Sequence, residues 1–492
     1  MRQRSDQEPA GANAAAVVPR LPDGRVLVGQ RTHAARSWPG TVAFPGGGLE
    51  EVDHHLPLLE GDSLPHDARA ARACALRELG EEVSLWRLAR PDGRADVDAA
   101  ARATAALAAG EGLAQVLAQE RLVLDDRGLV PLTLWRVPSG RFAVQQFLLS
   151  LHAEPAPLPV ASEELSAVRW VSPRALLAEW RAGRAFLLSP IRRVVAGLAA
   201  HEHDVVSAVR ALAQPPTDAE RARLDLMEGV CLLAARSATL PPATHTNAVL
   251  LGGLAGANFL VDPAAHGADE RVRFDRLLEA VLGGRSLTAI VCTHHHADHV
   301  ADVARLAAKH GAPVWAHAET AARVRFKVDR LLAEGEQLAT AVAAFRVLHT
   351  PGHAPGHLCL FDEAAQLLVA GDMIAAEGSI LIDPDDGHMG RYLESLGRLI
   401  GLNPRGVVPA HGPLIVDGAA RLAEQRAHRH ARQERVEAAA RGTGVHDIVR
   451  EVYGADTPEA MLPFAERSVL AALRWAEERG VAAEDEGRWT VR

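Results

Sequence analysis

The chain has 492 residues, of which 48% are hydrophobic and 23% are charged, and its formal net charge is −9. This length exceeds one ordinary hydrophobic core, so we expect two to four domains. The negative charge excludes a chain that coats nucleic acid through bulk charge, although a local basic face remains compatible with it. No stretch approaches the ~20 apolar residues that a membrane span needs, so we expect no membrane partner.

The cysteines and the N-terminus indicate a compartment. Cys74, Cys231, Cys292 and Cys359 are scattered without C-x-x-C pairing, and three of them lie within apolar runs. This pattern predicts reduced, buried thiols. Residues 1–9 are polar and lack the apolar core of an export signal. We therefore expect a cytoplasmic protein.

A strand-like run and a glycine loop, residues 40–48, precede a segment rich in carboxylates. On a helix Glu78, Glu81 and Glu82 fall at positions i, i+3 and i+4, so the three side chains share one face. Like charges so arranged repel each other and favour a bound cation, and oxygen ligands suit Mg²⁺ or Mn²⁺. The alternative is a solvated acidic face that Arg77 caps.

The loop and helix together resemble the Nudix box, whose core is R-E-x-x-E-E. The resemblance implies an α/β/α sandwich over residues 12–205. It also implies Glu78, Glu81 and Glu82 as catalytic carboxylates for cleaving a diphosphate linkage, with Glu78 and Glu82 as metal ligands. The chain departs from the box at Ser84, where glycine is usual, and at Arg69, where a further glutamate is expected. A Nudix domain that only binds a ligand therefore stays an alternative.

The rest of the N-terminal third alternates between helical and strand-like segments. An alanine-rich helical stretch covers residues 97–120, and strand-like runs follow at 129–135, 141–142, 146–148 and 168–173, before a closing helix. This order resembles the Nudix branch with a helical insertion, several members of which act on coenzyme A and its esters. The resemblance implies a small nucleotide or coenzyme A-type substrate.

A polar, proline-marked break at residues 213–218 predicts a linker, which we bound at 206–221. Strand-like runs then follow at 229–233, 246–251 and 259–263, with a helical stretch at 273–282. Strands that alternate with helices suit two mixed sheets flanked by helices. The next domain is expected over residues 222–425.

The motif H-x-H-x-D-H occupies His294 to His299, directly after an apolar strand-like run at 287–292. His294, His296, Asp298 and His299 place four side chains that can bind a metal on one short turn, and imidazole nitrogen and carboxylate oxygen suit zinc. The alternative is a surface loop that happens to be rich in histidine, but its position after a core strand favours a metal site.

Three later segments repeat this arrangement. Residues 350–357, 368–372 and 407–412 each place a His or an Asp next to glycine after an apolar run. The four segments resemble the metallo-β-lactamase superfamily, which implies an αββα sandwich. The resemblance implies a first Zn²⁺ held by His294, His296 and His353, a second held by Asp298, His299 and His411, and Asp372 bridging them. His295 and His357 have no ligand role in that pattern.

Such a two-metal centre implies hydrolysis. Two ions ~3.5–4 Å apart polarise the scissile group and lower the pKa of water toward ~7. Asp298 is the side chain expected to orient the nucleophile. The motif does not choose between ester, thioester, amide and phosphodiester substrates.

The C-terminus is expected to be helical, basic and compact. Arginines recur along one helix at positions 421, 426, 429, 432 and 435, and two helices and a hairpin with Trp489 follow. A solvated helix face is the plainer interpretation of the arginines. The tail has a winged-helix-like pattern over residues 426–492. Together with Ile382-Asp383-Pro384 and Gly387-His388-Met389, it resembles the β-lactamase-like protein 2 group.

That resemblance implies single-strand endoribonuclease activity, while related fungal enzymes are thioesterases on carrier-bound polyketides. The leading hypothesis from the sequence is a two-zinc hydrolase acting on single-stranded RNA, fused to a Nudix domain. The second is a thioesterase acting on acyl-CoA or acyl-carrier substrates. A third treats the Nudix half as a binding module beside one working site.

Overall fold

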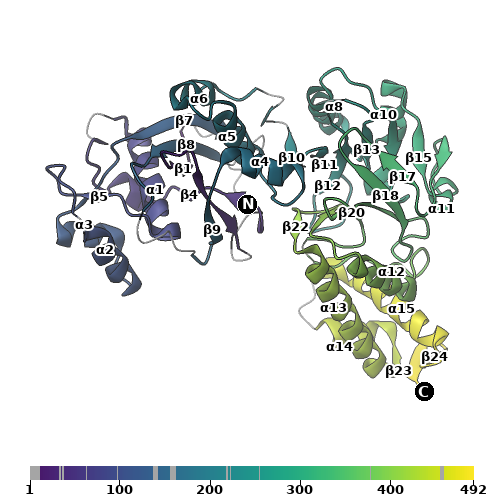
Figure 1. Ribbon diagram of the computed structural model, residues 1–492. Helices are drawn as coiled ribbons and strands as arrows, with labels where there is room; N and C mark the ends of the chain where they lie inside the picture. Colours follow the sequence, from purple (N-terminus) through teal and green to yellow (C-terminus); the bar gives the residue numbers. More distant parts are fainter. Residues whose placement is uncertain are drawn as a thin grey trace. The chain divides into compact units, whose positions relative to one another are not determined.

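The computed structural model describes residues 11–32, 35, 38–61, 64–96, 98–136, 142–155, 162–217, 220–221, 223–253, 255–376, 378–454 and 459–492. The chain divides after Met227 into two compact units, and the second begins at Glu228. Both units combine helices with sheets (Figure 1). The expected fold class, a multidomain α/β and α+β protein, is therefore confirmed.

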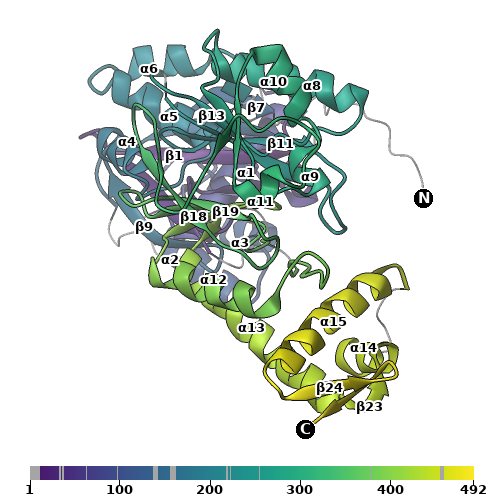
Figure 2. The same cartoon turned by 90° about the vertical axis from the view of Figure 1, so that its right-hand side faces the viewer.

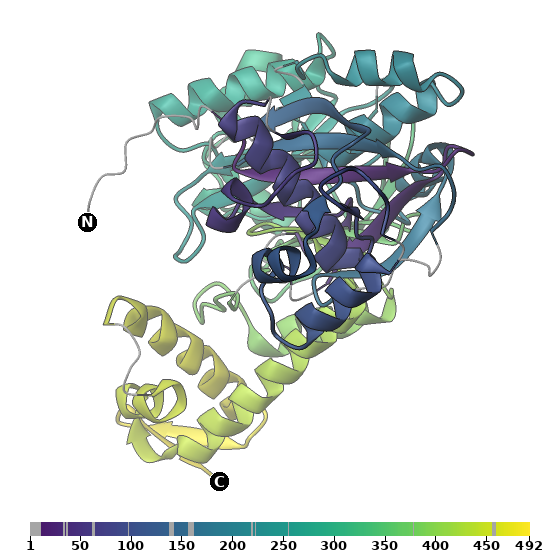
Figure 3. The ribbon, with the colours of Figure 1, turned by 90° about the vertical axis from the view of Figure 1, so that its left-hand side faces the viewer.

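The first unit is built on one sheet with helices on both faces (Figures 1 and 3). Its strands run in the order β3-β2-β1-β8-β7, with β4 paired to β1 and β9 paired to β2. The strands and helices of this unit are β1 (Ala14–Arg20), β2 (Val26–Arg31), β3 (Val42–Ala43), β4 (Gly46–Gly48), η1 (Glu51–His54), α1 (His66–Val83), β5 (Leu88–Ala89), α2 (Ala99–Ala108), α3 (Leu113–Glu120), β6 (Val123–Leu124), β7 (Leu129–Arg136), β8 (Ala143–Ser150), β9 (Leu165–Val171), α4 (Pro173–Arg181), α5 (Ser189–Ala200), α6 (Val205–Leu212) and β10 (Leu224–Met227).

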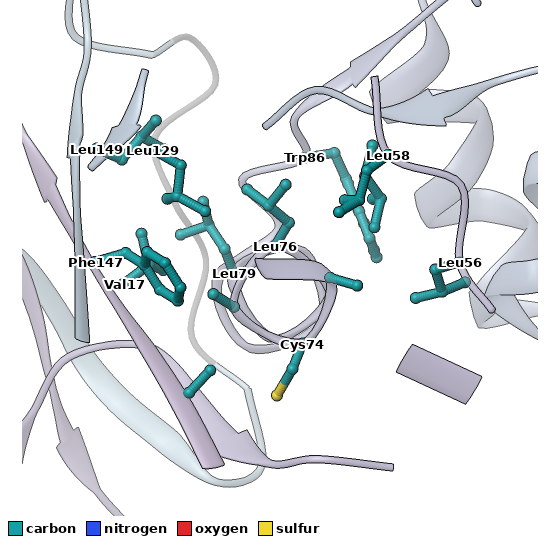
Figure 4. Close-up of a cluster of buried hydrophobic side chains, with 14 of the residues drawn as sticks. Val17, Leu56, Leu58, Cys74, Leu76, Leu79, Trp86, Leu129, Phe147 and Leu149 are labelled. Carbon is teal, nitrogen blue, oxygen red and sulfur yellow. The ribbon is translucent and has the colours of Figure 1, made fainter. Parts of the chain in front are cut away.

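Alternation along the strands explains the two covered faces. Val17 and Phe147 pack on α1 in the cluster that contains Leu76 (Figure 4). Their neighbours Val18 and Leu148 belong to the opposite cluster, with residues of α4, α5 and α6. Since successive side chains of a strand point to opposite faces, apolar residues at consecutive positions require cover on both sides.

The expected glycine loop is in part a strand. Gly46 to Gly48 form β4, which pairs antiparallel with β1 in the register Ala16↔Gly46. A Cβ on Gly46 would lie 2.4 Å from the backbone oxygen of Ala15. Gly46 is therefore needed for the close packing of β4 on β1, a role that the glycine-rich composition does not reveal.

Two further expectations differ from the structure. The alanine-rich stretch forms two helices, α2 and α3, because the chain turns at Gly110, whose φ is +88°. The expected linker at 206–221 contains helix α6, and the division between the units falls later. Residues 97, 141 and 218, which belong to the expected segments, lie outside the described residues.

The second unit contains two mixed sheets with helices on their outer faces and a helical C-terminal part. One sheet includes the order β11-β12-β13-β14-β15-β16, and the other is β17-β18-β19-β20-β21-β22. The elements of this unit are β11 (Val230–Arg236), β12 (His245–Leu251), β13 (Phe259–Val261), α8 (Ala268–Leu282), β14 (Ala289–Val291), α9 (Ala297–Val300), α10 (Val303–His310), β15 (Val314–Ala316), α11 (Ala318–Ala321), β16 (Arg330–Leu331), β17 (Gln337–Ala339), β18 (Ala344–His349), β19 (Leu358–Asp362), β20 (Leu367–Gly371), α12 (Met389–Gly401), β21 (Gly406–Pro409), β22 (Ile415–Val416), α13 (Gly418–Ala439), β23 (Arg441–Gly444), α14 (Val445–Tyr453), η3 (Glu459–Met461), α15 (Leu462–Glu478), β24 (Ala482–Asp485) and β25 (Arg488–Val491).

The C-terminal part has the expected helix, helix and hairpin, and α13 leads into it (Figure 2). Strand β25 lies between β23 and β24 in a small sheet. Val436, Val449, Leu473 and Trp489 are buried together in its core. The tryptophan of the hairpin therefore closes a separate small core, as expected of a winged-helix tail.

All four cysteines are buried thiols that form no disulfide. Within the part of the chain that the structure describes, no helix is long and apolar enough to cross a membrane.

We predict that Leu76→Ala destabilises the first unit by ~2–5 kcal/mol, because the side chain is fully buried against the sheet and its loss leaves a cavity. The measurement is the urea midpoint followed by circular dichroism. Val206→Ala, at a position 63% exposed in the same unit, is the control and should change stability by at most ~0.5 kcal/mol. Equal shifts for both variants would contradict this account of the core.

Candidate metal centre

The seven residues expected to bind metal all follow strands of the second unit. Strand β14 precedes the H-x-H-x-D-H turn, and β18, β20 and β21 precede His353, Asp372 and His411. Leu358 donates its backbone N–H to the oxygen of Thr293 at 2.9 Å, which ties the end of β14 to the start of β19. Loops from both sheets therefore meet at one place, where they bring their polar side chains together.

Three imidazoles form the first group. His353 Nε2 lies 2.9 Å from His296 Nδ1 and 3.2 Å from His294 Nε2, and the latter two nitrogens are 3.0 Å apart. Three nitrogens bound tetrahedrally to one ion at ~2.0–2.1 Å would be ~3.3 Å apart. The spacing of the three nitrogens therefore fits a single small cation.

A carboxylate and two imidazoles form the second group. The ligand atoms of Asp298, His299 and His411 all lie within 4.8 Å of one another. Asp298 Oδ2 is 3.5 Å from His411 Nε2. Burial works against the charge of Asp298, but a hydrogen bond with His411 keeps the pKa of this carboxyl below its usual value. Asp298 is therefore ionised at neutral pH.

Asp372 lies between the two groups. Its Oδ1 is 3.4 Å from His299 Nε2 and 3.5 Å from His411 Nε2. Its Oδ2 is 3.4 Å from His353 Nε2 in the first group. One oxygen thus faces each group, as a bridging carboxylate requires.

Acceptors outside the centre fix the tautomers of the five imidazoles. In each ring, one nitrogen donates its proton to such an acceptor, which leaves the other nitrogen, the one that faces the centre, available to bind a cation. The outer pairs are His294 Nδ1 with Thr293 Oγ1 at 3.0 Å, His296 Nε2 with Asp386 Oδ2 at 2.9 Å, His299 Nδ1 with Asp262 Oδ2 at 2.8 Å, His353 Nδ1 with the oxygen of Leu381 at 2.9 Å and His411 Nδ1 with the oxygen of His245 at 2.9 Å. Histidines that bind metals have such outer partners.

Buried polar atoms at the centre lack hydrogen-bond partners. Among the residues that the structure describes, His299 Nε2 and Asp372 Oδ1 have none, and the two residues are 0% and 7% exposed. Burial opposes a charge on His299, but the carboxylates of Asp372 and Asp262 raise its pKa well above the usual value. Those carboxylates would attract a metal cation as they attract this proton. The donor set therefore fits a pair of divalent cations.

Two imidazoles of the first group, those of His294 and His353, stay uncharged on their own. Burial lowers the pKa of His353 to about 4 and lowers the pKa of His294 well below its usual value. Both imidazoles are neutral at pH 7, so their lone pairs are available without the loss of a proton.

Two supporting carboxylates were not identified from the sequence. Asp262 accepts hydrogen bonds from the backbone N–H and hydroxyl of Thr293, at 2.7 and 2.6 Å, as well as facing His299. Its φ is +46°, a strained conformation directly after β13. Asp386 faces His296 from a loop ninety positions later. An aspartate that ends a buried strand was the available signal for Asp262, and the sequence offered none for Asp386.

His295 and His357 lie beside the centre. His357 Nε2 accepts the backbone N–H of Asp372 at 3.0 Å, and its Nδ1 is 2.8 Å from Thr350 Oγ1. It therefore fixes the backbone of the bridging carboxylate. His295 Nε2 is 3.3 Å from Asp386 Oδ2.

The three glutamates of the first unit gather around α1 and β4. Glu78 and Glu81 each accept from Arg77 Nη1 at 2.9 Å, and Glu82 accepts the N–H of Gly46 at 2.8 Å. Burial raises the pKa of Glu78 and of Glu82 to about 7. Among the described residues, the groups with three ligand atoms within 4.8 Å do not include these glutamates. The structure thus places two of them against Arg77 and the third against strand β4, and does not gather their carboxylates into one metal-binding group.

Asp53 supplies a carboxylate that the sequence search did not find. It binds Arg77 through two hydrogen bonds, at 2.8 and 3.0 Å, and is fully buried. The further glutamate was expected eight residues before Arg77, where Arg69 stands, whereas the carboxylate that binds Arg77 lies 24 residues before it. The long segment between β4 and α1 moves it further away along the chain.

Known proteins resemble parts of this chain. Residues 241–411 match the sequence profile of the Metallo-beta-lactamase superfamily, and residues 444–489 match the Beta-lactamase associated winged helix domain. A beta-lactamase-like protein 2 homolog of Drosophila melanogaster is 28% identical over 40% of this chain and 70% of its own length. A solved NUDIX hydrolase from Alicyclobacillus acidocaldarius is 25% identical with a TM-score of 0.34, over 40% of this chain and 95% of its own.

A further relative shows the family to which the chain belongs. The atrochrysone carboxyl ACP thioesterase of Aspergillus chevalieri is 30% identical over 42% of this chain and 69% of its own length. The matched family region includes all seven residues that form the two groups. The chain therefore belongs to the metallo-beta-lactamase superfamily, as a hydrolase of that fold followed by a winged-helix domain.

Proposed function

We propose that the second unit is a two-metal hydrolase in which His294, His296 and His353 hold one Zn²⁺ and Asp298, His299 and His411 hold another. Asp372 would bridge the two ions. The observation that carries this proposal is that the inward nitrogens of five imidazoles gather in two groups on either side of Asp372, whose buried Oδ1 has no hydrogen-bond partner among the described residues. Bound ions would supply Lewis-acid catalysis and a water of lowered pKa.

The side chains around the ions have separate tasks in this proposal. Asp298 is ionised, so it accepts a hydrogen bond from the attacking water and orients it. Asp262 and Asp386 hold the rings of His299 and His296 in place, and His357 holds the backbone of Asp372. The chain thereby presents a fixed set of donors before any substrate arrives.

We favour an acyl thioester as the substrate of this unit. Support comes from the thioesterase relative, which is matched over 69% of its length. A second argument concerns the basic helix α13, whose arginines would have to be available to contact RNA. Four of its five arginines contact groups of their own unit: Arg421 with Glu424, Arg429 with the oxygen of Ile380, Arg432 with His428 and Arg435 with the oxygen of Val452.

Single-stranded RNA is the second candidate substrate. The match of residues 444–489 to a winged-helix domain supports it, because winged helices and basic helices are common in nucleic-acid-binding proteins. Phosphate contacts would make RNA cleavage sensitive to salt.

For the first unit we propose a Nudix-type site over residues 12–205 that cleaves a diphosphate linkage of a nucleotide or coenzyme A derivative. The raised pKa values of Glu78 and Glu82 support it, because burial makes their charges costly without a cation. Mg²⁺ or Mn²⁺ suits such oxygen ligands. A binding role without catalysis is the alternative. The remaining domains are proposed at 222–425 and 426–492, and four buried thiols without a disulfide favour a cytoplasmic protein.

We predict that the purified chain binds about two zinc ions at the second unit and that His353→Ala lowers this number, because one nitrogen of the first group is lost. Metal analysis by mass spectrometry measures the number. His446→Ala removes an exposed imidazole of the winged-helix part and should leave it unchanged. An unchanged zinc content in His353→Ala would refute the ligand set.

We predict that the zinc-loaded chain hydrolyses acyl-CoA and leaves unstructured RNA intact, because four of the five arginines of α13 contact groups within the unit. Free thiol release and gel electrophoresis measure the two reactions, and the His353→Ala chain is the control for both. Turnover of RNA without turnover of thioester, decreasing with added salt, would reverse our order of substrates.

We predict that Glu82→Gln abolishes Mg²⁺-dependent cleavage of a diphosphate such as coenzyme A, because the amide carries no charge to bind the cation. Thioester turnover by the second unit should not change. Glu51→Gln, at an exposed acidic position of the same unit, is the matched control. Diphosphate cleavage that persists in Glu82→Gln would overturn the Nudix-type site.

A further inference from the structure

The segment from Ile380 to His388, which we call the 380–388 segment, lies against the first group of imidazoles. The oxygen of Leu381 is 2.9 Å from His353 Nδ1, and Asp386 Oδ2 is 2.9 Å from His296 Nε2. His388 donates its backbone N–H to the oxygen of Gly352 at 2.7 Å, one residue before His353. The segment therefore supports two of the three imidazoles of that group.

The winged-helix part binds the same segment from outside. Arg467 Nε donates to Asp383 Oδ2 at 2.9 Å, and its Nη2 donates to Asp383 Oδ1 and, at 2.6 Å, to Asp385 Oδ2. Arg474 Nη1 donates to the oxygen of Pro384 at 2.9 Å and to Asp385 Oδ1 at 3.1 Å. Both arginines belong to α15 and are seven residues apart, which is about two helical turns, so they share one face.

The turn between the arginines and the imidazoles is internally bonded. Asp385 donates its N–H to Asp383 Oδ1 at 2.9 Å, and Gly387 donates to the oxygen of Asp383 at 2.6 Å. Asp386 lies between these two anchored residues. A displacement of Asp383 would therefore carry Asp386, and with it the partner of His296.

Other contacts hold α15 beside this segment. His388 Nε2 is 2.9 Å from Glu478 Oε2, at the end of α15. A Cβ on Gly390 would lie 2.5 Å from Trp475 Nε1, so the helix packs directly on the start of α12. Ala471 and Trp475 belong to the hydrophobic cluster of the metal-centre domain. The helix that carries Arg467 and Arg474 is therefore held in place by contacts of its own.

We propose that Arg467 and Arg474 are positioning residues for the metal centre, which they serve by fixing Asp383 and Asp385 and thereby the contact between Asp386 and His296. This inference rests on the proposed function of the second unit. Exposed ion pairs add little to folding stability, so the expected effect is on the geometry of the centre. The winged-helix domain is then part of the metal site, whatever substrate the site takes.

The test is the zinc affinity of the full chain, measured by competition with a chromophoric chelator. We predict that Arg467→Gln combined with Arg474→Gln weakens the binding of one of the two ions by about 10- to 100-fold, the range for loss of an outer partner of a metal ligand. The second ion should change less, since Asp262 and His245 support its ligands. Arg479→Gln, which removes an ion pair with Glu437 in the same domain, is the matched control.

A second arm separates positioning from loss of fold. Asp386→Asn should weaken the binding of the same ion. Adding it to the arginine variant should cause little further loss of affinity, because both changes break the same series of contacts from α15 to His296. Asp385→Asn, at a side chain 60% exposed, provides a milder break if the arginine variant does not fold.

The outcomes are distinct. A wild-type chain that binds no zinc would overturn the metal centre, and this inference with it. A wild-type chain that binds two ions, with folded arginine and Asp385 variants of unchanged affinity, would overturn this inference alone. Additive effects of the arginine and Asp386 changes would also overturn it.

Discussion

The structure of the second unit depends on hydrogen bonds that point away from its centre. Each of the five imidazoles is held at one nitrogen by an outer acceptor, which leaves the other nitrogen facing inward, where it can bind a cation. Without these acceptors the rings would adopt either tautomer and several rotamers, and the inward nitrogens would not converge. Burial would then disfavour the cluster, since unpaired buried polar atoms are costly.

The outer acceptors come from distant parts of the chain, so the centre requires the complete fold of the second unit. Asp262 directly follows β13, His245 begins β12, and Leu381 and Asp386 lie in the 380–388 segment. Segments that follow strands of the two sheets contribute the ligands. Loops between a strand and a helix contribute most of the acceptors that hold the imidazoles. The C-terminal winged helix extends this dependence through Arg467 and Arg474. A domain that looks like an appendage in sequence thereby shares the framework of the site.

The sequence predicted the inner residues of the centre better than their supports. His294 to His299 form a short motif after a strand, and glycine marks the later segments, so local pattern was sufficient there. Asp386 and Asp53 act on residues far away along the chain, and no local pattern distinguishes them from other acidic residues. The strand β4 was expected as a loop because glycine composition suggests turns, whereas only the partner strand reveals the need for close packing. Helix α6 was missed because a proline-marked break follows it directly.

Asp372 couples the two groups of ligands, because its side chain lies between them. Its two oxygens face different groups, and its backbone N–H is fixed by His357, so the carboxylate cannot turn toward one group without leaving the other. A cation in the first group would draw negative charge from Oδ1, and a cation in the second would draw it from Oδ2. Occupancy of either group therefore changes the affinity of the other by the same factor, as thermodynamic linkage demands. The two ions would therefore not bind independently of each other, because both would act on the carboxylate of Asp372.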